Sequence, residues 1–273
     1  MASSLADRIK IAKQGQGVDV GVSIQFILNC GARIAGSCHG GSELGAAAFI
    51  KKTGFIPFDT CLQYEACSAE STEDAYKPGS GCSARTDYKC TPMNTCRTCS
   101  TFAASGGKCR ALSYFPNATV AEYGSAIGEK AMMAEIYARG PIACGINADP
   151  LDEYTGGILE SDASTGVNHA VAAVGWGVTA KGQKYWIVRN SWGETWGEMG
   201  FFRIARGTNT LGFEDSCSWA TPGAFSVVNK PCFEGGENCG LETGRYIDPG
   251  SMPAERRVPH GAALAARFAR SEL

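Results

Sequence analysis

The chain has 273 residues, of which 44% are hydrophobic and 19% charged, enough apolar material to bury a core of domain size. Its 25 basic and 27 acidic residues leave a net charge of -2, so the composition gives no electrostatic reason to expect nucleic-acid binding. No apolar run reaches the length of a membrane-spanning helix. We therefore expect no nucleic-acid or membrane partners. We also expect the chain to be a monomer.

Helices are predicted for the first part of the chain at about residues 2–13, 22–30 and 42–52. In the first of them, Leu5, Ile9 and Ala12 share one face at spacings of four and three residues. The third ends at Gly54, which follows two lysines. Cysteine-rich loops are expected from there to about residue 110.

The second part of the chain is predicted to be rich in strands. A helix over 125–139, ended by Gly140-Pro141, precedes strands near 142–146, 169–175, 184–189 and 200–204. The 35 glycines and 11 prolines imply many turns, in keeping with an α+β protein, and the length suits one two-lobed domain. We place a helical, disulfide-rich lobe at 1–112, a strand-rich lobe at 113–222, and a flexible C-terminal extension at 223–273.

One histidine and one asparagine lie at the ends of two of these predicted strands. His169 begins one strand and Asn190 follows the end of the next, so the two side chains meet if the strands pair. A histidine held by such a partner can take a proton from a thiol nucleophile and return it to a leaving amine. A lone histidine beside apolar residues is more often a partly buried structural residue, so the surrounding sequence has to decide.

That surrounding sequence resembles the papain family of cysteine peptidases. The matching blocks are NHAVAAVGWG from Asn168 and NSWGETWGEMG from Asn190. The resemblance implies a two-lobed papain-like fold, peptide or protein substrates, and no metal or cofactor. It also assigns roles: His169 is the general acid and base, Asn190 holds the imidazole through its amide oxygen, Trp192 shields that contact, and Asn168 offers its backbone carbonyl to substrate.

Further matches concern substrate binding and the branch of the family. Gly40 and Gly41, in the segment SCHGG, resemble the family's glycines that let a substrate backbone approach as an added strand, although a plain turn would also explain them. The segments 6–10, 129–142 and 154–158 look closest to the cathepsin X branch, which implies a possible carboxypeptidase. The match covers nearly all of residues 1–220.

In this family, the nucleophile lies in a Cys-Gly-Ser-Cys-Trp segment at the start of the central helix. The first predicted helix resembles the rest of that helix, which places the nucleophile roughly one to two turns before Met1. We therefore expect the chain as given not to hydrolyse peptides. The alternatives are a non-catalytic papain-like protein that binds peptides or inhibitors, and a structural protein stapled by disulfides.

The chain has 13 cysteines. The resemblance implies four disulfides, Cys30–Cys90, Cys61–Cys96, Cys99–Cys109 and Cys144–Cys217, and leaves Cys38 unpaired. Two further pairs are close in sequence and are plausible local bridges, Cys67–Cys82 and Cys232–Cys239. A rival reading is a zinc site made of Cys90, Cys96, Cys99 and Cys109, for which one Cys-x-x-Cys unit is weak support.

Such a cysteine content is typical of an oxidising compartment. The same compartment suits the sequon at Asn117, which is a glycosylation acceptor in a translocated chain. No signal peptide is visible at the start of the sequence. We expect the full-length form to be lysosomal or secreted.

Overall fold

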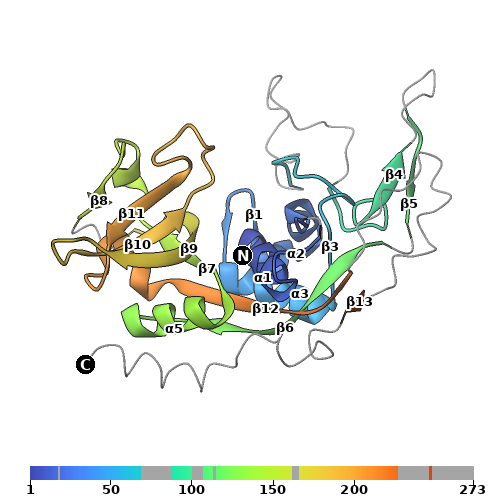
Figure 1. The fold of residues 1–273 in the computed structure, drawn as a ribbon. Coiled ribbons are helices and arrows are strands. Elements are labelled where there is room, and N and C mark those ends of the chain that lie inside the picture. Colours follow the sequence, from blue (N-terminus) through green and yellow to red (C-terminus); the bar gives the residue numbers. More distant parts are fainter. Residues whose placement is uncertain are drawn as a thin grey trace, which may run out of the picture.

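A computed structural model describes residues 1–17, 19–68, 88–99, 107–112, 115–161, 166–226 and 246–247 of the chain. Its α-helices are α1 (Ala2–Ala12), α2 (Ile24–Ala35), α3 (Glu43–Thr53) and α5 (Glu129–Arg139), and two short 3-10 helices span Asp149–Leu151 and Thr210–Asp215. Helices α1 to α3 gather on one side of the molecule, and the strands β7 to β11 on the other (Figure 1). Among the described residues, no helix is long and apolar enough to span a bilayer.

The strands form one large sheet and two small hairpins. The order in the large, nine-stranded sheet is β3 (Ile56–Pro57), β6 (Asn117–Ser125), β12 (Cys217–Ser226), β7 (Ile142–Ile146), β9 (His169–Val178), β10 (Lys184–Arg189), β11 (Phe201–Ala205) and β8 (Ile158–Leu159), with β13 (Tyr246–Ile247) also paired to β12. Neighbours are antiparallel except β11 and β8. The hairpins are β1 (Gly36–Ser37) with β2 (Gly40–Gly41) and β4 (Arg97–Cys99) with β5 (Cys109–Ala111).

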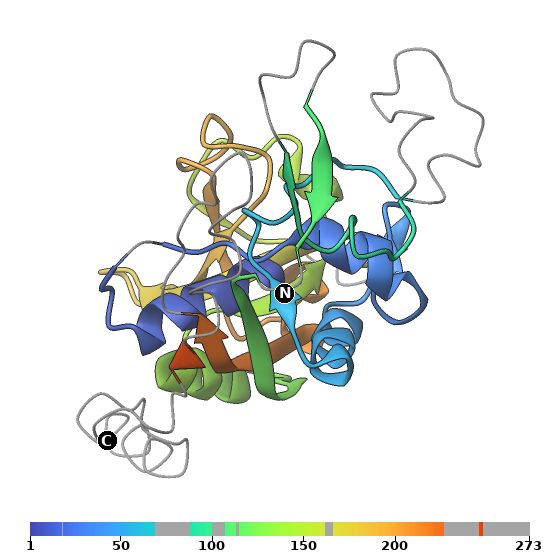
Figure 2. The ribbon, with the colours of Figure 1, turned by 90° about the vertical axis from the view of Figure 1, so that its right-hand side faces the viewer.

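Two hydrophobic cores lie under these elements. The first is built around α1, α2 and α3, where Leu5, Ile9 and Phe26 are almost fully buried. The second lies between α5 and strands β7 to β11, around Trp186 and Phe202. Strand β12 supplies residues to both cores, whereas its partner β6 supplies buried residues to the helical core alone. The two paired strands run beneath both sides of the molecule, and the β4–β5 hairpin stands away from it (Figure 1; Figure 2).

This architecture confirms the predicted α+β papain-like fold class, but several elements differ in detail. Helix α2 runs to Ala35, beyond the predicted end at residue 30, and begins where the Ser23 hydroxyl accepts a hydrogen bond from the backbone N–H of Phe26 (3.1 Å). Helix α5 begins at Glu129 rather than at residue 125, because residue 125 still belongs to β6 and residues 126–128 connect the two elements.

The lobe boundary near residue 112 stays a prediction, since β12 contributes to both cores. Of the extension at 223–273, only residues 223–226 and 246–247 are described.

The four disulfides implied by the family resemblance are present: Cys30–Cys90, Cys61–Cys96, Cys99–Cys109 and Cys144–Cys217. Because Cys90, Cys96, Cys99 and Cys109 are all bonded in this way, the alternative zinc site is wrong. Cys67 also belongs to a disulfide, but its predicted partner Cys82 lies outside the described residues, as do Cys232 and Cys239.

Two other predicted sites can be placed. Cys38 is an exposed free thiol in the β1–β2 hairpin. Asn117 is only 8% exposed, and its side-chain amide donates a hydrogen bond to the carbonyl of Phe115 (3.0 Å). A glycan on that amide would require the side chain to give up this contact, and the predicted glycosylation stays a prediction.

Candidate active site

His169 and Asn190 are brought together by the pairing of β9 and β10. His169 is the first residue of β9, and Asn190 directly follows Arg189, the last residue of β10. Imidazole Nε2 lies 2.8 Å from the side-chain Oδ1 of Asn190. An amide oxygen only accepts hydrogen bonds, so Nε2 carries a hydrogen and donates it. The other ring nitrogen, Nδ1, is then the one that can take a proton from a nucleophile.

The amide of Asn190 is oriented from two directions. Its Oδ1 accepts a second hydrogen bond, from the backbone N–H of Ser191 (2.8 Å), and its own backbone N–H donates to the carbonyl of Gly200 (2.9 Å). Its Nδ2 is buried without a hydrogen-bond partner in the described part of the chain. The position of Oδ1 therefore depends on where the backbone of residues 189–191 is held.

An aromatic cluster covers this contact. The ring centroid of Trp192 lies 5.1 Å from that of His169, at an interplanar angle of 34°. Trp192 is 39% exposed. Trp196 meets Trp192 edge-on at 5.1 Å and packs on Tyr154 and Phe202. Trp192 thus lies beside the imidazole and packs on Trp196, and its role as a shield of the histidine–asparagine contact stays a prediction.

Within the described part of the chain, the contacts of Asn168, Gly40 and Gly41 do not involve the side chains of His169 or Asn190. The side chain of Asn168 accepts from the backbone N–H of Ala148 and donates to Asp149 Oδ1, both at 2.8 Å, which fixes the residue before His169. Gly41 is required by its own hairpin, because a Cβ there would lie 2.2 Å from the carbonyl oxygen of Ala35. Gly40 is exposed, with a φ of 134° and open space beside it. The plain-turn reading is therefore sufficient for Gly41, and a substrate-binding role for either glycine stays a prediction.

Helix α1 is bound to the strand-rich side by two consecutive charged residues that sequence reasoning missed. The carboxylate of Asp7 accepts from both guanidinium nitrogens of Arg189, at 3.2 and 2.5 Å. Arg8 is 2% exposed and pairs with Glu135 of α5 at 2.9 Å. A signal for Arg8 was present in the sequence, because it lies three residues after Leu5 and so falls on the apolar face of the predicted helix.

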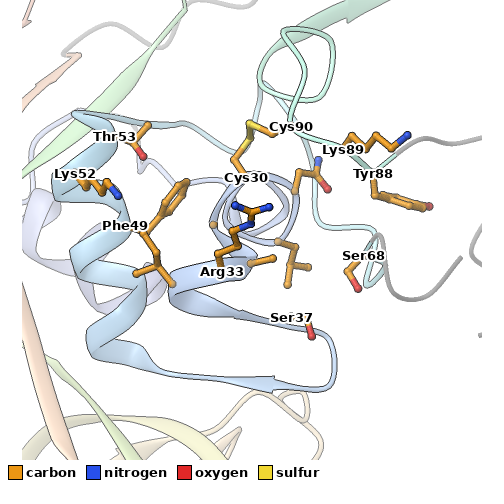
Figure 3. Close-up of a pocket in the computed structure, with 15 residues that line it drawn as sticks. Cys30, Arg33, Ser37, Phe49, Lys52, Thr53, Ser68, Tyr88, Lys89 and Cys90 are labelled. Atoms are coloured by element: carbon orange, nitrogen blue, oxygen red, sulfur yellow. A yellow bond between two sulfur atoms is a disulfide. The ribbon is translucent and has the colours of Figure 1, made fainter. Parts of the chain in front are cut away.

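A separate cavity of about 760 Å³ lies between α2, α3 and residues 88–90 (Figure 3). Its lining includes Arg33, Lys52 and the Cys30–Cys90 disulfide, but neither His169 nor Asn190. Arg33 and Lys52 belong to the last turns of α2 and α3, where a cation stabilises a helix end whether or not anything binds nearby. The cavity therefore gives no reason to move the candidate chemistry away from His169.

Comparison with known proteins gives the class of this protein. Residues 1–221 match the model of the papain family of cysteine proteases, and the chain belongs to that family. It is similar to cathepsin Z of Onchocerca volvulus, with 35% identity over 229 residues that cover 81% of this chain and 66% of that protein. It is also similar to cathepsin B-like protease 1 of Arabidopsis thaliana, with 28% identity over 82% of this chain and 54% of that protein.

Solved structures agree with these relatives. The bromelain protease of Ananas comosus, solved in complex with the inhibitor E64, shares 26% identity at a TM-score of 0.56, covering 81% of this chain and 85% of that one. Procathepsin L2 from the larval midgut of Tenebrio molitor shares 26% identity at a TM-score of 0.59. The match covers 81% of this chain and 59% of that one. The chain spans between about half and two thirds of the length of the two curated relatives named above.

Proposed function

We propose that this chain carries the histidine–asparagine half of a papain-type peptidase site. The observation that carries the proposal is the 2.8 Å contact between His169 Nε2 and Asn190 Oδ1 under the ring of Trp192. It leaves Nδ1 as the proton-accepting atom of a correctly oriented imidazole. Peptides or proteins are the substrates, and a single copy of the chain supplies both residues.

In the proposed reaction, Nδ1 of His169 takes the proton of a cysteine thiol, and the thiolate attacks the carbonyl carbon of a peptide bond. The carbonyl electron pair moves to oxygen and then returns, the carbon–nitrogen bond breaks, and the imidazolium gives its proton to the leaving amine. Water then attacks the thioester with His169 again as base, which releases the acid and regenerates the thiol. Asn190 keeps the ring in one tautomer and one orientation throughout.

The proposed nucleophile is a cysteine that precedes α1, one to two turns before Met1. Among the described residues, the only free thiol is Cys38, which lies in the β1–β2 hairpin. We propose that residues 1–273 alone do not hydrolyse peptides, and that the longer, active-type protein works in a lysosomal or secreted setting, which the four described disulfides suit.

The test is peptide hydrolysis by the native protein, compared with His169→Ala and with Lys130→Ala, an exposed α5 control. Loss of the general base is expected to lower kcat by about two to four orders of magnitude, with no change in the control. Products from peptides with free and with amidated C-termini separate carboxypeptidase from endopeptidase action. Native protein that binds such peptides without cleaving them would replace the proposal with the non-catalytic alternative.

A further inference from the structure

The ion pair between Asp7 and Arg189 connects α1 to the residue next to Asn190. Both Nη atoms of Arg189 donate to the two carboxylate oxygens of Asp7, so the contact is bidentate. Each side chain is 29% exposed. Two parallel hydrogen bonds fix the direction of the guanidinium as well as its distance, which a single contact would not do.

Arg189 is well placed to transmit that constraint. As the last residue of β10, it is paired with Ala172 of β9 and with Phe201 of β11, and its peptide bond leads directly into Asn190. Because Asn190 Nδ2 has no hydrogen-bond partner in the described part of the chain, the amide is oriented only through Oδ1 and the backbone. A small shift of the end of β10 would therefore move Oδ1 away from His169 Nε2.

The neighbouring pair on α1 has a different character. Arg8 and Glu135 are almost fully buried, and Arg8 also donates to the carbonyls of Gly140 and Pro141. That pair ties α1 to α5 and to the Gly140-Pro141 segment that follows it. The Asp7 pair is 29% exposed on each side, so its electrostatic contribution is screened by water. What its two parallel hydrogen bonds add is a fixed geometry.

We propose that Asp7 and Arg189 are positioning residues that hold Asn190 Oδ1 against His169 Nε2 and set this pair relative to the axis of α1. The consequence for turnover rests on the proposed function, because the proposed nucleophile lies on the segment that leads into α1. The consequence for the His169–Asn190 hydrogen bond does not, and it can be measured without any catalytic activity.

The experiment records the ring-nitrogen chemical shifts and the Nε2–H exchange rate of His169 in the 273-residue chain, which has only three histidines. The variants are Asp7→Ala and Asp7→Asn, with Asp7→Glu as the conservative rescue. Lys10→Met is the matched control, because it removes the more exposed Lys10–Asp19 pair from the same helix. Melting temperatures are measured on every variant.

The proposal predicts that Asp7→Ala exposes the Nε2–H to faster exchange and mixes the two tautomers, with a nearly unchanged melting temperature and recovery in Asp7→Glu. If Asp7→Ala unfolds, the same readout on Asp7→Asn decides. Unchanged nitrogen shifts and exchange in a folded variant would overturn the proposal. In the native protein, Asp7→Ala should lower kcat roughly 10- to 100-fold at constant KM. A native protein without peptidase activity would defeat the proposed function and leave the spectroscopic result standing.

Discussion

Replacing Arg8 by methionine tests the buried attachment of α1 to the strand-rich side. Arg8 is 2% exposed and donates to the carbonyls of Pro141 (2.8 Å), Gly140 (3.0 Å) and Ala220 (3.3 Å), besides its ion pair with Glu135. Burial lowers the pKa of its guanidinium to about 10, and Glu135 opposes that shift. At neutral pH the pair is therefore ionic.

The magnitude follows from what the substitution leaves behind. Methionine fills part of the volume but donates nothing, so three carbonyl groups lose a charged donor and Glu135 keeps Arg139 as its partner. Removing one member of a buried ion pair typically costs about 3–5 kcal/mol, and the remaining contact with Arg139 places the expected loss near the lower end of that range. The shift of the unfolding midpoint is this loss divided by the urea m-value, which is about 1–3 kcal/mol/M. The midpoint is therefore expected to fall by roughly 1 M or more.

The assay is urea unfolding followed by tryptophan fluorescence, with Lys10→Met as the control. The Lys10–Asp19 pair is 40% and 76% exposed, so the control should change the free energy of unfolding by about 0.5 kcal/mol or less. A loss below about 1 kcal/mol for Arg8→Met would refute the reasoning, because it would mean that water or a rearranged side chain satisfies the three carbonyls equally well.

Three further predictions use other parts of the molecule. Hydrogen bonds from Arg203 lower the pKa of Glu198 below 4.5, so the stability from this pair is present above that pH and is lost as the pH falls through the lowered pKa. Glu198→Gln should therefore cost about 0.5–1 kcal/mol in urea unfolding at neutral pH and less near about pH 3, and an equal cost at both would contradict the assignment. Met199, 79% exposed with a φ of 57°, is in a left-handed conformation that asparagine tolerates better. Met199→Asn should raise the free energy of unfolding by roughly 0.5–1 kcal/mol, and a decrease would count against backbone strain there. If the Asn117 sequon is used as the sequence predicts, peptide-N-glycosidase treatment of the native protein should release glycan mass from the peptide that contains it, and an unchanged mass would contradict the prediction.

Sequence reasoning located the elements whose apolar pattern is regular. The strands predicted at 142–146 and 184–189 match β7 and β10, and the helices predicted at 2–13 and 42–52 match α1 and α3 to within a residue. In each case a run of buried residues is bounded by a glycine, a proline or a change to polar residues.

The missed strands show why the rest could not be predicted. Strand β12 contains Pro222-Gly223, a pair that reads as a turn, yet the chain continues through it with register shifts on either side. Its partner β6 contains Gly124 against the ring of Trp219, a close approach that only the tertiary structure reveals. The contact of His169 with Asn190 followed from the predicted pairing of their strands, whereas the Asp7–Arg189 pair joins residues 182 positions apart and has no local signature.

The long ribbon of β6 and β12 also constrains how the molecule can deform. Ala118 and Phe225 of this ribbon lie in the core beneath the helices, whereas Cys217 at the other end of β12 lies in the core beneath α5. Bending between the two cores would break ladder hydrogen bonds in the middle of paired strands, which is far costlier than swinging a loop. Hinge motion of one core against the other is thus unfavourable, so a peptide bound as proposed above would be accommodated by surface loops and side-chain rotation. The same continuity favours loss of both cores in a single cooperative transition.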